Sequence, residues 1–202
     1  MAALSGEHQK ANAALALRIC RAWIARYSTE PNFLKLNLHL VRIALQNTNW
    51  PGRQQKFTKG QNSWYLDGAH TIESIQFAVD WFVRKSSAHA KKILLFHCSH
   101  DRSYQQLLAA LLQISSSCFQ EAFFARPYSP TDLVKESEDL YLSLHQSMKE
   151  FFKVSTGISA RACTVKDAVT ILEAIDSPTE ILVTGSLYIV GDVMRILDIP
   201  IP

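Results

Sequence analysis

Small and polar residues gather at three points where a run of apolar residues stops, and each point could hold an anionic ligand. These points are LDGAHT at 66–71, HCSHDRS at 97–103 and VTGSL at 183–187. Helix-like sequence follows each of them. The first backbone N–H groups of a helix are unpaired and carry a partial positive charge, so they can bind a carboxylate or a phosphate.

The first of these turns, DGAHT, has the residue types of a binding turn. Gly68 would allow a tight change of direction, and Thr71 could cap the following helix. Asp67 and His70 would then face a cleft. A purely structural interpretation is equally open, because Asp67 and Thr71 are ordinary turn and capping residues and His70 could be a surface histidine.

The second turn contains Ser99, His100 and Asp101, which are the residue types of a nucleophilic triad. Consecutive residues cannot present their side chains to one another in the relay geometry, so nucleophilic catalysis is not expected here. We expect this segment to be a loop that faces a ligand. Asp101 or Ser103 would cap the next helix.

Metal-binding and phosphate-binding motifs are weak or absent in the sequence. His97, Cys98 and His100 could be imagined as metal ligands, but no second ligand cluster of familiar spacing accompanies them. The third turn places Gly185 and Ser186 between a strand and a helix. The sequence nevertheless contains neither GxGxxG nor GxxxxGK followed by Ser or Thr, so it has no phosphate-cradling loop of its own.

The elements that would position these turns alternate between strands and helices. Apolar residues at helical spacing predict helices over 4–27, 32–46, the segment after His70, 105–114, 131–152, 165–175 and 187–197. Short apolar runs predict strands at 54–58, 63–66, 91–98, 118–125 and 180–184, the first two as a hairpin. The alternation predicts an α/β, Rossmann-like fold with a mostly parallel sheet, helices on both faces and ligands at the carboxyl ends of the strands.

One stretch fits this alternation poorly. Residues 126–160 are the least regular part of the chain, and their prolines and acidic cluster indicate a solvated insertion or a simple surface excursion.

Length and composition limit the classes of protein that the chain could be. A length of 202 residues suits one α/β domain with a short appendage. A net charge of +3 is too small for an expected nucleic-acid partner, and no apolar run is long enough to span a membrane, so a soluble chain is expected. The four scattered cysteines indicate reduced thiols rather than a disulfide framework.

Spaced blocks of the sequence resemble one known family. The segments GEHQKANAALAL at 6–17, NWPGR at 49–53 and YLDGAHTIES at 65–74 resemble the end of the central ATPase domain and the start of the C-terminal domain of the Mur ligase superfamily. The closing segment VTGSLYIVGDVMRIL at 183–197 narrows the resemblance to folylpolyglutamate synthase. The blocks occur in the order found in that family.

This resemblance implies an organisation and an activity. The chain would comprise the terminal helix of an ATPase domain at 1–30, a connecting helix or linker at 31–48 and a Mur ligase-like C-terminal domain at 49–202. Such enzymes use ATP and Mg²⁺ to add L-glutamate to the γ-carboxyl of tetrahydrofolate or a folylpolyglutamate, through an acyl phosphate, in one-carbon metabolism. The resemblance implies a monomer that is cytoplasmic, mitochondrial or both, and the sequence shows no targeting segment.

The resemblance also assigns roles to particular residues. For ATP, the resemblance implies that the adenine lies near Gln9 and Asn12, the phosphates near Arg53 and the ribose near Asp67. For the incoming glutamate, it implies contacts with His70, Ser74 and Ser186, with His70 as the catalytic residue. An alternative for Ser74 and Ser186 is that they only cap helices. An Arg that follows a Pro-Gly turn has no evident structural task and can hold phosphate oxygens bidentately.

Two departures from the family pattern matter. The family often has Asn-Pro after the histidine, whereas Thr71 and Ile72 stand here, which leaves the details of the glutamate contact open. The phosphate loop and the magnesium ligands are not among these residues, so we expect the chain alone to be inactive. One alternative is a non-catalytic module that binds glutamate or nucleotide and partners a full-length ligase. Another is a Mur-type ligase for a cell-wall precursor.

Overall fold

The chain divides into two compact units in the computed structural model. One unit comprises residues 1–50 and the other residues 51–201. The structure describes residues 7–27, 37–48, 50–99, 101–115, 118–128 and 138–200. The assignment of residues 1–30 to an ATPase domain stays a prediction.

The first unit contains two helices, α1 (Glu7–Tyr27) and α2 (Leu38–Asn47). Asn37 caps α2, because its side-chain oxygen accepts a hydrogen bond from the His39 backbone N–H at 2.9 Å. Both helices expose large apolar side chains, among them Leu15, Ile19, Trp23, Leu38 and Leu40. Of the predicted second helix, 32–46, the part from Leu38 on is helical and Asn37 is its cap, and residues 28–36 lie outside the described part.

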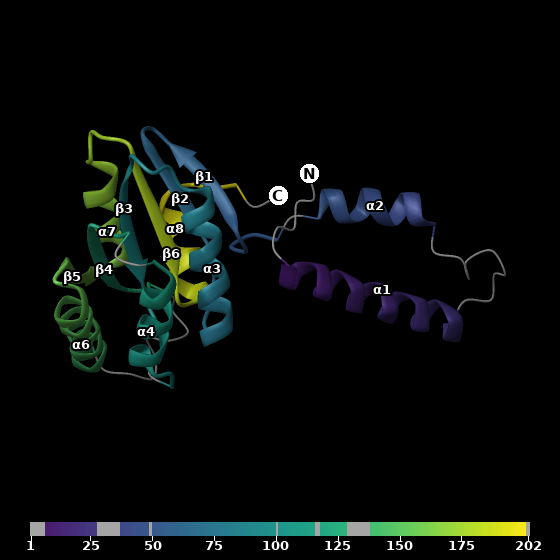
Figure 1. Ribbon diagram of the computed structural model, residues 1–202, viewed down its shortest axis with the longest axis horizontal. Coiled ribbons are helices and arrows are strands. Elements are labelled where there is room, and N and C mark those ends of the chain that lie inside the picture. The colour runs from purple at the N-terminus through teal and green to yellow at the C-terminus, as the bar shows by residue number, and fades with distance from the viewer. Residues whose placement is uncertain are drawn as a thin grey trace. The chain divides into compact units, whose positions relative to one another are not determined.

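The second unit begins with the hairpin β1 (Gln55–Lys59) and β2 (Asn62–Leu66), as predicted. Alternation then follows through α3 (Ile72–Lys85), β3 (Lys91–Phe96), α4 (Tyr104–Ser115), β4 (Glu121–Arg126), α6 (Glu138–Thr156), β5 (Ser159–Thr164), α7 (Val165–Glu173), β6 (Thr179–Thr184) and α8 (Leu187–Ile196). Figure 1 shows these elements as one sheet between two helical layers.

The sheet has the strand order β1-β2-β6-β3-β4-β5, and only β1 pairs antiparallel to its neighbour. One apolar core lies between the sheet and helices α3, α4 and α6, and a second core lies between the other face and helices α7 and α8. All six residues of β6 are buried, as a central strand covered on both faces requires. The predicted fold class is confirmed.

The stretch 126–160 is less irregular than expected. Its described part holds the whole of α6, which overlaps the predicted helix 131–152 from Glu138 on, and the edge strand β5 begins at Ser159, within the same stretch. The sequence signal of β5 is weak because an edge strand is half exposed and carries no continuous apolar run. Two other strand boundaries differ from the prediction. Strand β3 ends at Phe96, before His97 and Cys98, and β4 starts only at Glu121.

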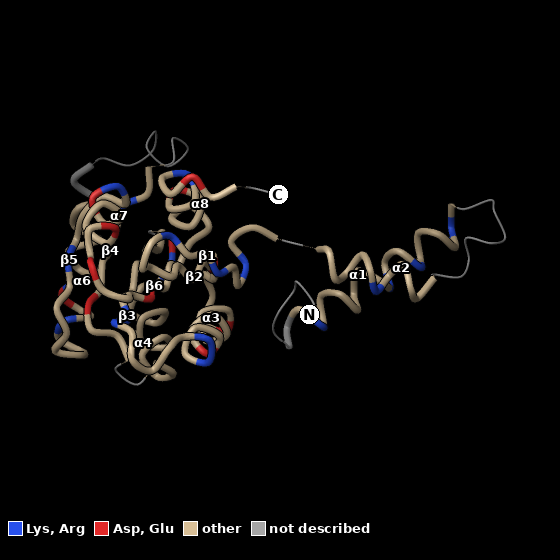
Figure 2. Tube along the Cα trace, turned by 90° about the horizontal axis from the view of Figure 1, so that it is seen from above, with Lys and Arg blue, Asp and Glu red and all other residues tan. Residues whose placement is uncertain are grey.

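Charge is spread over the second unit without a basic stripe along one element. Figure 2 shows Lys and Arg interspersed with Asp and Glu around the sheet and its helices. In the described ranges, no helix has the length and apolarity needed to cross a membrane. All four cysteines are free thiols.

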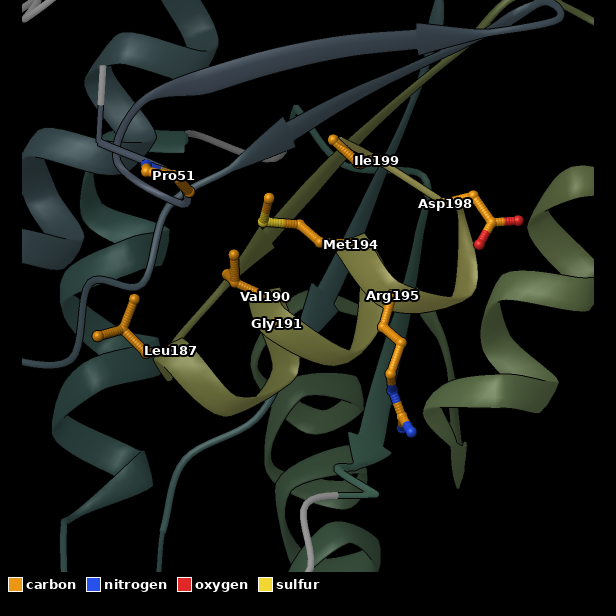
Figure 3. A pocket seen from close by; sticks show the side chains of 8 residues that line it. All are labelled: Pro51, Leu187, Val190, Gly191, Met194, Arg195, Asp198 and Ile199. Atoms are coloured by element: carbon orange, nitrogen blue, oxygen red, sulfur yellow. The ribbon is translucent and has the colours of Figure 1, made fainter. Parts of the chain in front are cut away.

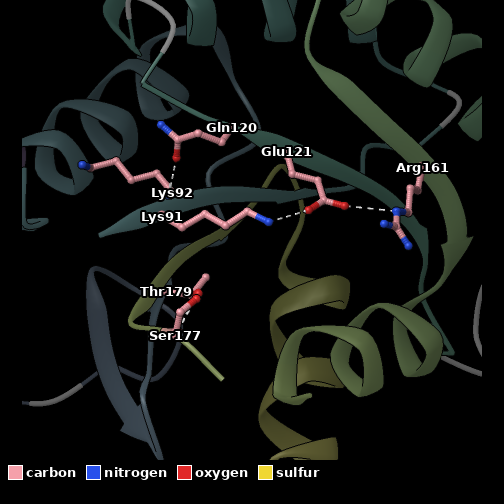
Figure 4. A network of polar contacts seen from close by, with 7 residues as sticks. All are labelled: Lys91, Lys92, Gln120, Glu121, Arg161, Ser177 and Thr179. Atoms are coloured by element: carbon pink, nitrogen blue, oxygen red, sulfur yellow. Dashed lines mark hydrogen bonds and ion pairs between the residues drawn. The ribbon is translucent and has the colours of Figure 1, made fainter. Parts of the chain in front are cut away.

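Charged groups connect three strands near their amino-terminal ends. Glu121 accepts a hydrogen bond from Lys91 Nζ at 2.9 Å and forms an ion pair with Arg161 Nε at 3.0 Å, so it joins β3, β4 and β5 (Figure 4). Nearby, the buried Glu180 accepts from the Tyr65 hydroxyl at 3.1 Å. Burial and this carboxylate raise the pKa of Tyr65, so the phenol stays protonated and donates. At this edge of the sheet, charged and polar side chains of neighbouring strands therefore pair with one another.

Replacement of the central carboxylate of this network tests its contribution to stability. We expect Glu121→Ala to lower the free energy of unfolding by about 1–2 kcal/mol, because one charged hydrogen bond and one ion pair are lost while the two partly exposed cations can recover water. Urea unfolding followed by near-UV circular dichroism measures the change. Glu150→Ala is the matched control, since Glu150 forms an exposed pair with Lys149, and it should change stability by less than about 0.5 kcal/mol.

Candidate ligand site at the carboxyl edge of the sheet

Three strand ends that are distant in sequence meet at the carboxyl edge of the sheet. Strand β6 pairs with β2 on one side and with β3 on the other, with Val183 opposite Leu66 and Thr184 opposite Phe96. The turns after these strands are the three turns singled out from the sequence. Helices α3, α8 and α4 start after them, so three helix N-termini follow strand ends along the same edge, as an anion site requires.

Two hydrogen bonds connect the turn before β1 to the turn after β2. The Gly68 backbone N–H donates to the Gly52 carbonyl at 2.9 Å, and the Gln54 N–H donates to Asp67 Oδ2 at 3.0 Å. Gln54 has a φ of 44°, a left-handed conformation that non-glycine residues seldom adopt. Such a conformation persists where surrounding contacts fix it, often at a functional site. The carboxylate of Asp67 is thus held in place and is only 7% exposed.

Arg53 lies beside the glycine of the DGAHT turn. A Cβ atom added to Gly68 would lie 3.1 Å from Arg53 Nη1, so the guanidinium is next to the backbone of this turn. Arg53 is half-buried and makes no hydrogen bond or ion pair with another residue of the described ranges. A guanidinium in this position can bind an anionic group from outside the chain.

His70 has one ring nitrogen engaged in the turn and one available. Nδ1 lies 2.9 Å from the Gly68 carbonyl oxygen, which can only accept, so Nδ1 carries the proton of this hydrogen bond. In the neutral ring Nε2 is then an acceptor. Among the described residues Nε2 has no hydrogen-bond partner, and the side chain is half-buried. His70 can therefore accept a proton or a hydrogen bond from a ligand at this edge.

Thr71, Ser74 and Ser186 have structural tasks in the described chain. Thr71 caps α3 and forms a capping box with Ser74, whose hydroxyl also accepts from the His70 backbone N–H at 3.0 Å. Ser186 caps α8 and accepts from the Tyr188 N–H at 3.1 Å. The capping roles are thus present, and a direct role of the two serines toward glutamate stays a prediction.

The third strand end, after β3, is packed tightly against the turn after β6. Gly185 has a φ of 97°, and a Cβ there would lie 2.1 Å from the His97 carbonyl oxygen. The buried ring of His97 stacks on His145 of α6, with Nδ1 3.0 Å from the His145 Nε2 atom. The sequence offered no signal for this pair, because 48 positions separate the two histidines.

The remaining predicted residues fall in different places. Ser103 is the residue before α4, and its hydroxyl accepts from the Gln106 N–H at 3.4 Å, in agreement with a capping role. Asp101 instead accepts from Ser99 Oγ at 2.5 Å, and His100 lies outside the described residues. Gln9 and Asn12 lie on α1 in the first unit, where Asn12 Nδ2 donates to Gln9 Oε1 at 3.2 Å.

A groove of the second unit contains none of the predicted site residues. It has a volume of about 690 Å³, and its lining side chains come mainly from α8 (Figure 3). The lining residues are Pro51, Leu187, Val190, Gly191, Met194, Arg195, Asp198 and Ile199. Leu187 connects the groove to the site, because its side chain lies against Gly68. In the described chain, no group of three His, Cys, Asp or Glu residues could hold a metal ion.

Fold and turns together define an α/β domain of the kind found at the C-terminus of Mur-type ligases. The family of the dihydrofolate synthetase C-terminal domain matches residues 48–196, which is most of the chain. The chain belongs to the folylpolyglutamate synthase family, through this C-terminal domain.

Relatives in this family are longer than the chain. Human mitochondrial folylpolyglutamate synthase is 38% identical over 146 residues, which cover 60% of the chain and 24% of the human protein. The folylpolyglutamate synthase of Saccharomyces cerevisiae is 33% identical over 220 residues, which cover 96% of the chain and 39% of the yeast protein. The chain therefore spans less than half the length of these relatives.

Solved structures share the fold. Folylpolyglutamate synthase of Mycobacterium tuberculosis, in complexes with ADP and AMPPCP, superposes with a TM-score of 0.69 at 21% identity, covering 98% of the chain and 42% of that protein. The Thermotoga maritima enzyme superposes with a TM-score of 0.63 at 23% identity, covering 97% of the chain and 40% of that protein.

The close approach at Gly185 gives a direct test of how the site is held. We expect Gly185→Ala to destabilise the second unit by about 2–4 kcal/mol, because the new methyl group meets the His97 carbonyl and the left-handed φ disfavours alanine. Gly191→Ala on α8 is the control, since a Cβ there meets no atom within 4 Å, and it should stabilise the helix by up to about 1 kcal/mol. Equal effects of both changes in urea unfolding would contradict the inference that the close approach of Gly185 to the His97 carbonyl holds the site together.

Proposed function

We propose that this chain supplies the amino-acid side and part of the nucleotide side of a ligase that adds L-glutamate to the γ-carboxyl of a tetrahydrofolate. The observation that carries the proposal is the pairing of Arg53 with the DGAHT turn, which places a guanidinium and an available imidazole nitrogen at one edge of the sheet. Such a reaction has two anionic substrates besides ATP, so cationic and N–H groups must hold them against their mutual repulsion.

On the nucleotide side, Arg53 binds the phosphates of ATP and Asp67 the ribose. A relative from M. tuberculosis has been solved with ADP and AMPPCP, and one from Yersinia pestis with AMPPNP and a Mn ion. These complexes support the use of a nucleotide and a metal ion by a ligase that contains this chain. Gln9 and Asn12 serve the adenine. The described residues offer no cluster for Mg²⁺, so the metal is held by other residues of a complete ligase.

On the amino-acid side, His70 acts on the incoming glutamate together with Ser74 and Ser186. The γ-carboxylate of the folate first takes the terminal phosphoryl group of ATP and releases ADP. The amine of glutamate then attacks the acyl carbon, the amide bond forms and phosphate leaves. An ammonium group cannot attack, and Nε2 of His70 can take its proton because Nδ1 is occupied by the Gly68 carbonyl.

The 202 residues lack a phosphate-cradling loop, so they do not form the acyl phosphate by themselves. The alternative function is a non-catalytic module that keeps a glutamate or nucleotide site and associates with a full-length ligase. Two observations together favour this alternative: the 202 residues lack a phosphate-cradling loop, and their strand-end turns are nevertheless well ordered by hydrogen bonds and helix caps. The human relative is named as mitochondrial, which is compatible with a cytoplasmic or mitochondrial parent enzyme. A monomeric chain stays a prediction.

An activity assay separates a self-sufficient ligase from the proposed partial site. We expect the purified chain to produce no folate-dependent ADP from ATP, Mg²⁺, tetrahydrofolate and L-glutamate, because the groups that activate the terminal phosphate are absent. A coupled ADP assay measures this, with a full-length folylpolyglutamate synthase as positive control. ADP formation that requires both folate and glutamate would show that the chain is catalytically complete.

Nucleotide binding by the chain tests the role of Arg53. We expect ADP to shift the amide resonances of residues 52–54 and 67–70 in an NMR titration, with a dissociation constant in the millimolar range. Arg53→Gln should weaken this binding about tenfold, since a bidentate contact to phosphate is lost. Lys56→Gln, an equal change of charge on exposed β1, is the matched control and should leave binding within about twofold. Equal weakening by both variants would show that only net charge matters.

A further inference from the structure

The first residue of α8, Leu187, lies against the two turns that hold Arg53. A Cβ atom added to Gly68 would lie 2.3 Å from Leu187 Cδ2 and 2.6 Å from Leu187 Cγ, and one added to Gly52 would lie 3.7 Å from the same Cδ2 atom. The tip of Leu187 therefore fills the place of the missing side chain at Gly68 and lies beside Gly52. Glycine at position 68 is what makes room for it.

The guanidinium of Arg53 lies next to the same point. The Cβ position of Gly68 is 3.1 Å from Arg53 Nη1, so the leucine tip and the guanidinium are neighbours on one side of the Gly68 backbone. The Gly68 N–H donates to the Gly52 carbonyl at 2.9 Å, which fixes the distance between the two turns. Leu187 thus contacts both the turn from which Arg53 extends and the turn beside which its guanidinium lies.

Helix α8 holds Leu187 firmly in this place. Its residues Ile189, Val190 and Val193 are buried in the second core. A Cβ atom on Gly52 would also lie 2.8 Å from Val190 Cγ1, so a core side chain of the same helix supports that turn. Leu187 itself is 45% exposed. It is therefore a rigidly mounted side chain at the surface rather than a part of the core.

Arg53 needs a support of this kind, because its side chain makes no hydrogen bond or ion pair with another residue of the described ranges. A long side chain with several rotatable bonds loses conformational entropy when an anion fixes it, and this loss weakens binding. An apolar group packed beside the arginine restricts these bonds before the ligand arrives. A guanidinium is weakly hydrated, so such a neighbour costs it little.

We propose that Leu187 is a positioning residue for Arg53, which restricts the guanidinium to the space beside the DGAHT turn where the phosphates of the nucleotide bind. The inference rests on the proposed role of Arg53 and adds a residue that touches no ligand itself. The competing interpretation is that Leu187 only lines the apolar groove with residues such as Met194. Its loss would then change stability but not the arginine.

The mobility of the Arg53 side chain tests the proposal in the full chain without any ligand. Its Nε–H resonance is assigned by its absence from the spectrum of Arg53→Gln, and the heteronuclear ¹H–¹⁵N Overhauser effect reports motion of this group on the picosecond to nanosecond timescale. We expect Leu187→Ala to reduce the effect by at least half. Leu142→Ala is the matched control, since it truncates an exposed leucine of α6, and it should leave the effect unchanged.

The affinity for ADP is the second readout. Leu187→Ala should weaken ADP binding about fivefold, as expected when one long side chain must be ordered on binding. Leu187→Met keeps the volume and reach of the side chain and should return both readouts to within about twofold of the unaltered chain. If Leu187→Ala fails to fold, Leu187→Val, which removes only the tip, takes its place.

An unchanged Overhauser effect overturns the proposal, and so does unchanged affinity in a chain that binds ADP. A loss of stability alone, with both readouts unchanged, supports the competing interpretation. If the unaltered chain does not bind ADP, the proposed role of Arg53 fails, and the Overhauser effect still decides whether Leu187 positions the guanidinium.

A double variant checks the contact on which the proposal rests. Gly68→Ala alone should lower the midpoint of urea unfolding, because the new methyl group meets the tip of Leu187. In the Leu187→Ala background the methyl group has space, so the same change should lower the midpoint by less than half as much. It should also restore part of the Overhauser effect of Arg53, since the methyl group takes the place of the leucine tip. The same loss in both backgrounds overturns the proposal.

Discussion

The insertion of the last strand, β6, between β2 and β3 is the constraint on which the rest of the second unit depends. Its six residues are all buried, and its parallel pairing on both sides fixes the register of the two neighbours. Because of this register, the turns at Asp67, His97 and Gly185 lie along one edge although more than a hundred positions separate the first from the last. The close approach of Gly185 to the His97 carbonyl shows how little space the arrangement leaves.

The two ends of the sheet are built on different physical principles. At the amino-terminal end, side chains of the sheet satisfy one another, as Glu121 does with Lys91 and Arg161. At the carboxyl end, small residues and helix caps satisfy the backbone instead. This division leaves Arg53 and one nitrogen of His70 without partners among the described residues, and both side chains are half-buried, so a ligand can reach them.

Local patterns predicted most of the fold, and their failures have physical causes. The hairpin 55–66 and the cap at Thr71 follow from turn and capping residues that act over a few positions. Strand β5 was missed because a half-exposed edge strand lacks an apolar run. Within the site, the predicted residues at 53, 67 and 70 do lie on neighbouring turns. The left-handed Gln54 and the His97–His145 stack depend on contacts between distant segments, which no local pattern encodes.

A sheet of this topology offers more than one place for a ligand, because each reversal in the side of the following helix opens a crevice. Helices α4 and α8 follow the neighbouring strands β3 and β6 to opposite faces, and α6 and α7 follow β4 and β5 in the same way. Between β6 and β3, tight packing and turn residues fill the space and position individual groups. Between β4 and β5, the half-buried edge strand leaves the space open as a cavity. His145 lines this cavity and stacks on His97, so a buried pair of rings joins the wall of the cavity to the strand end after β3.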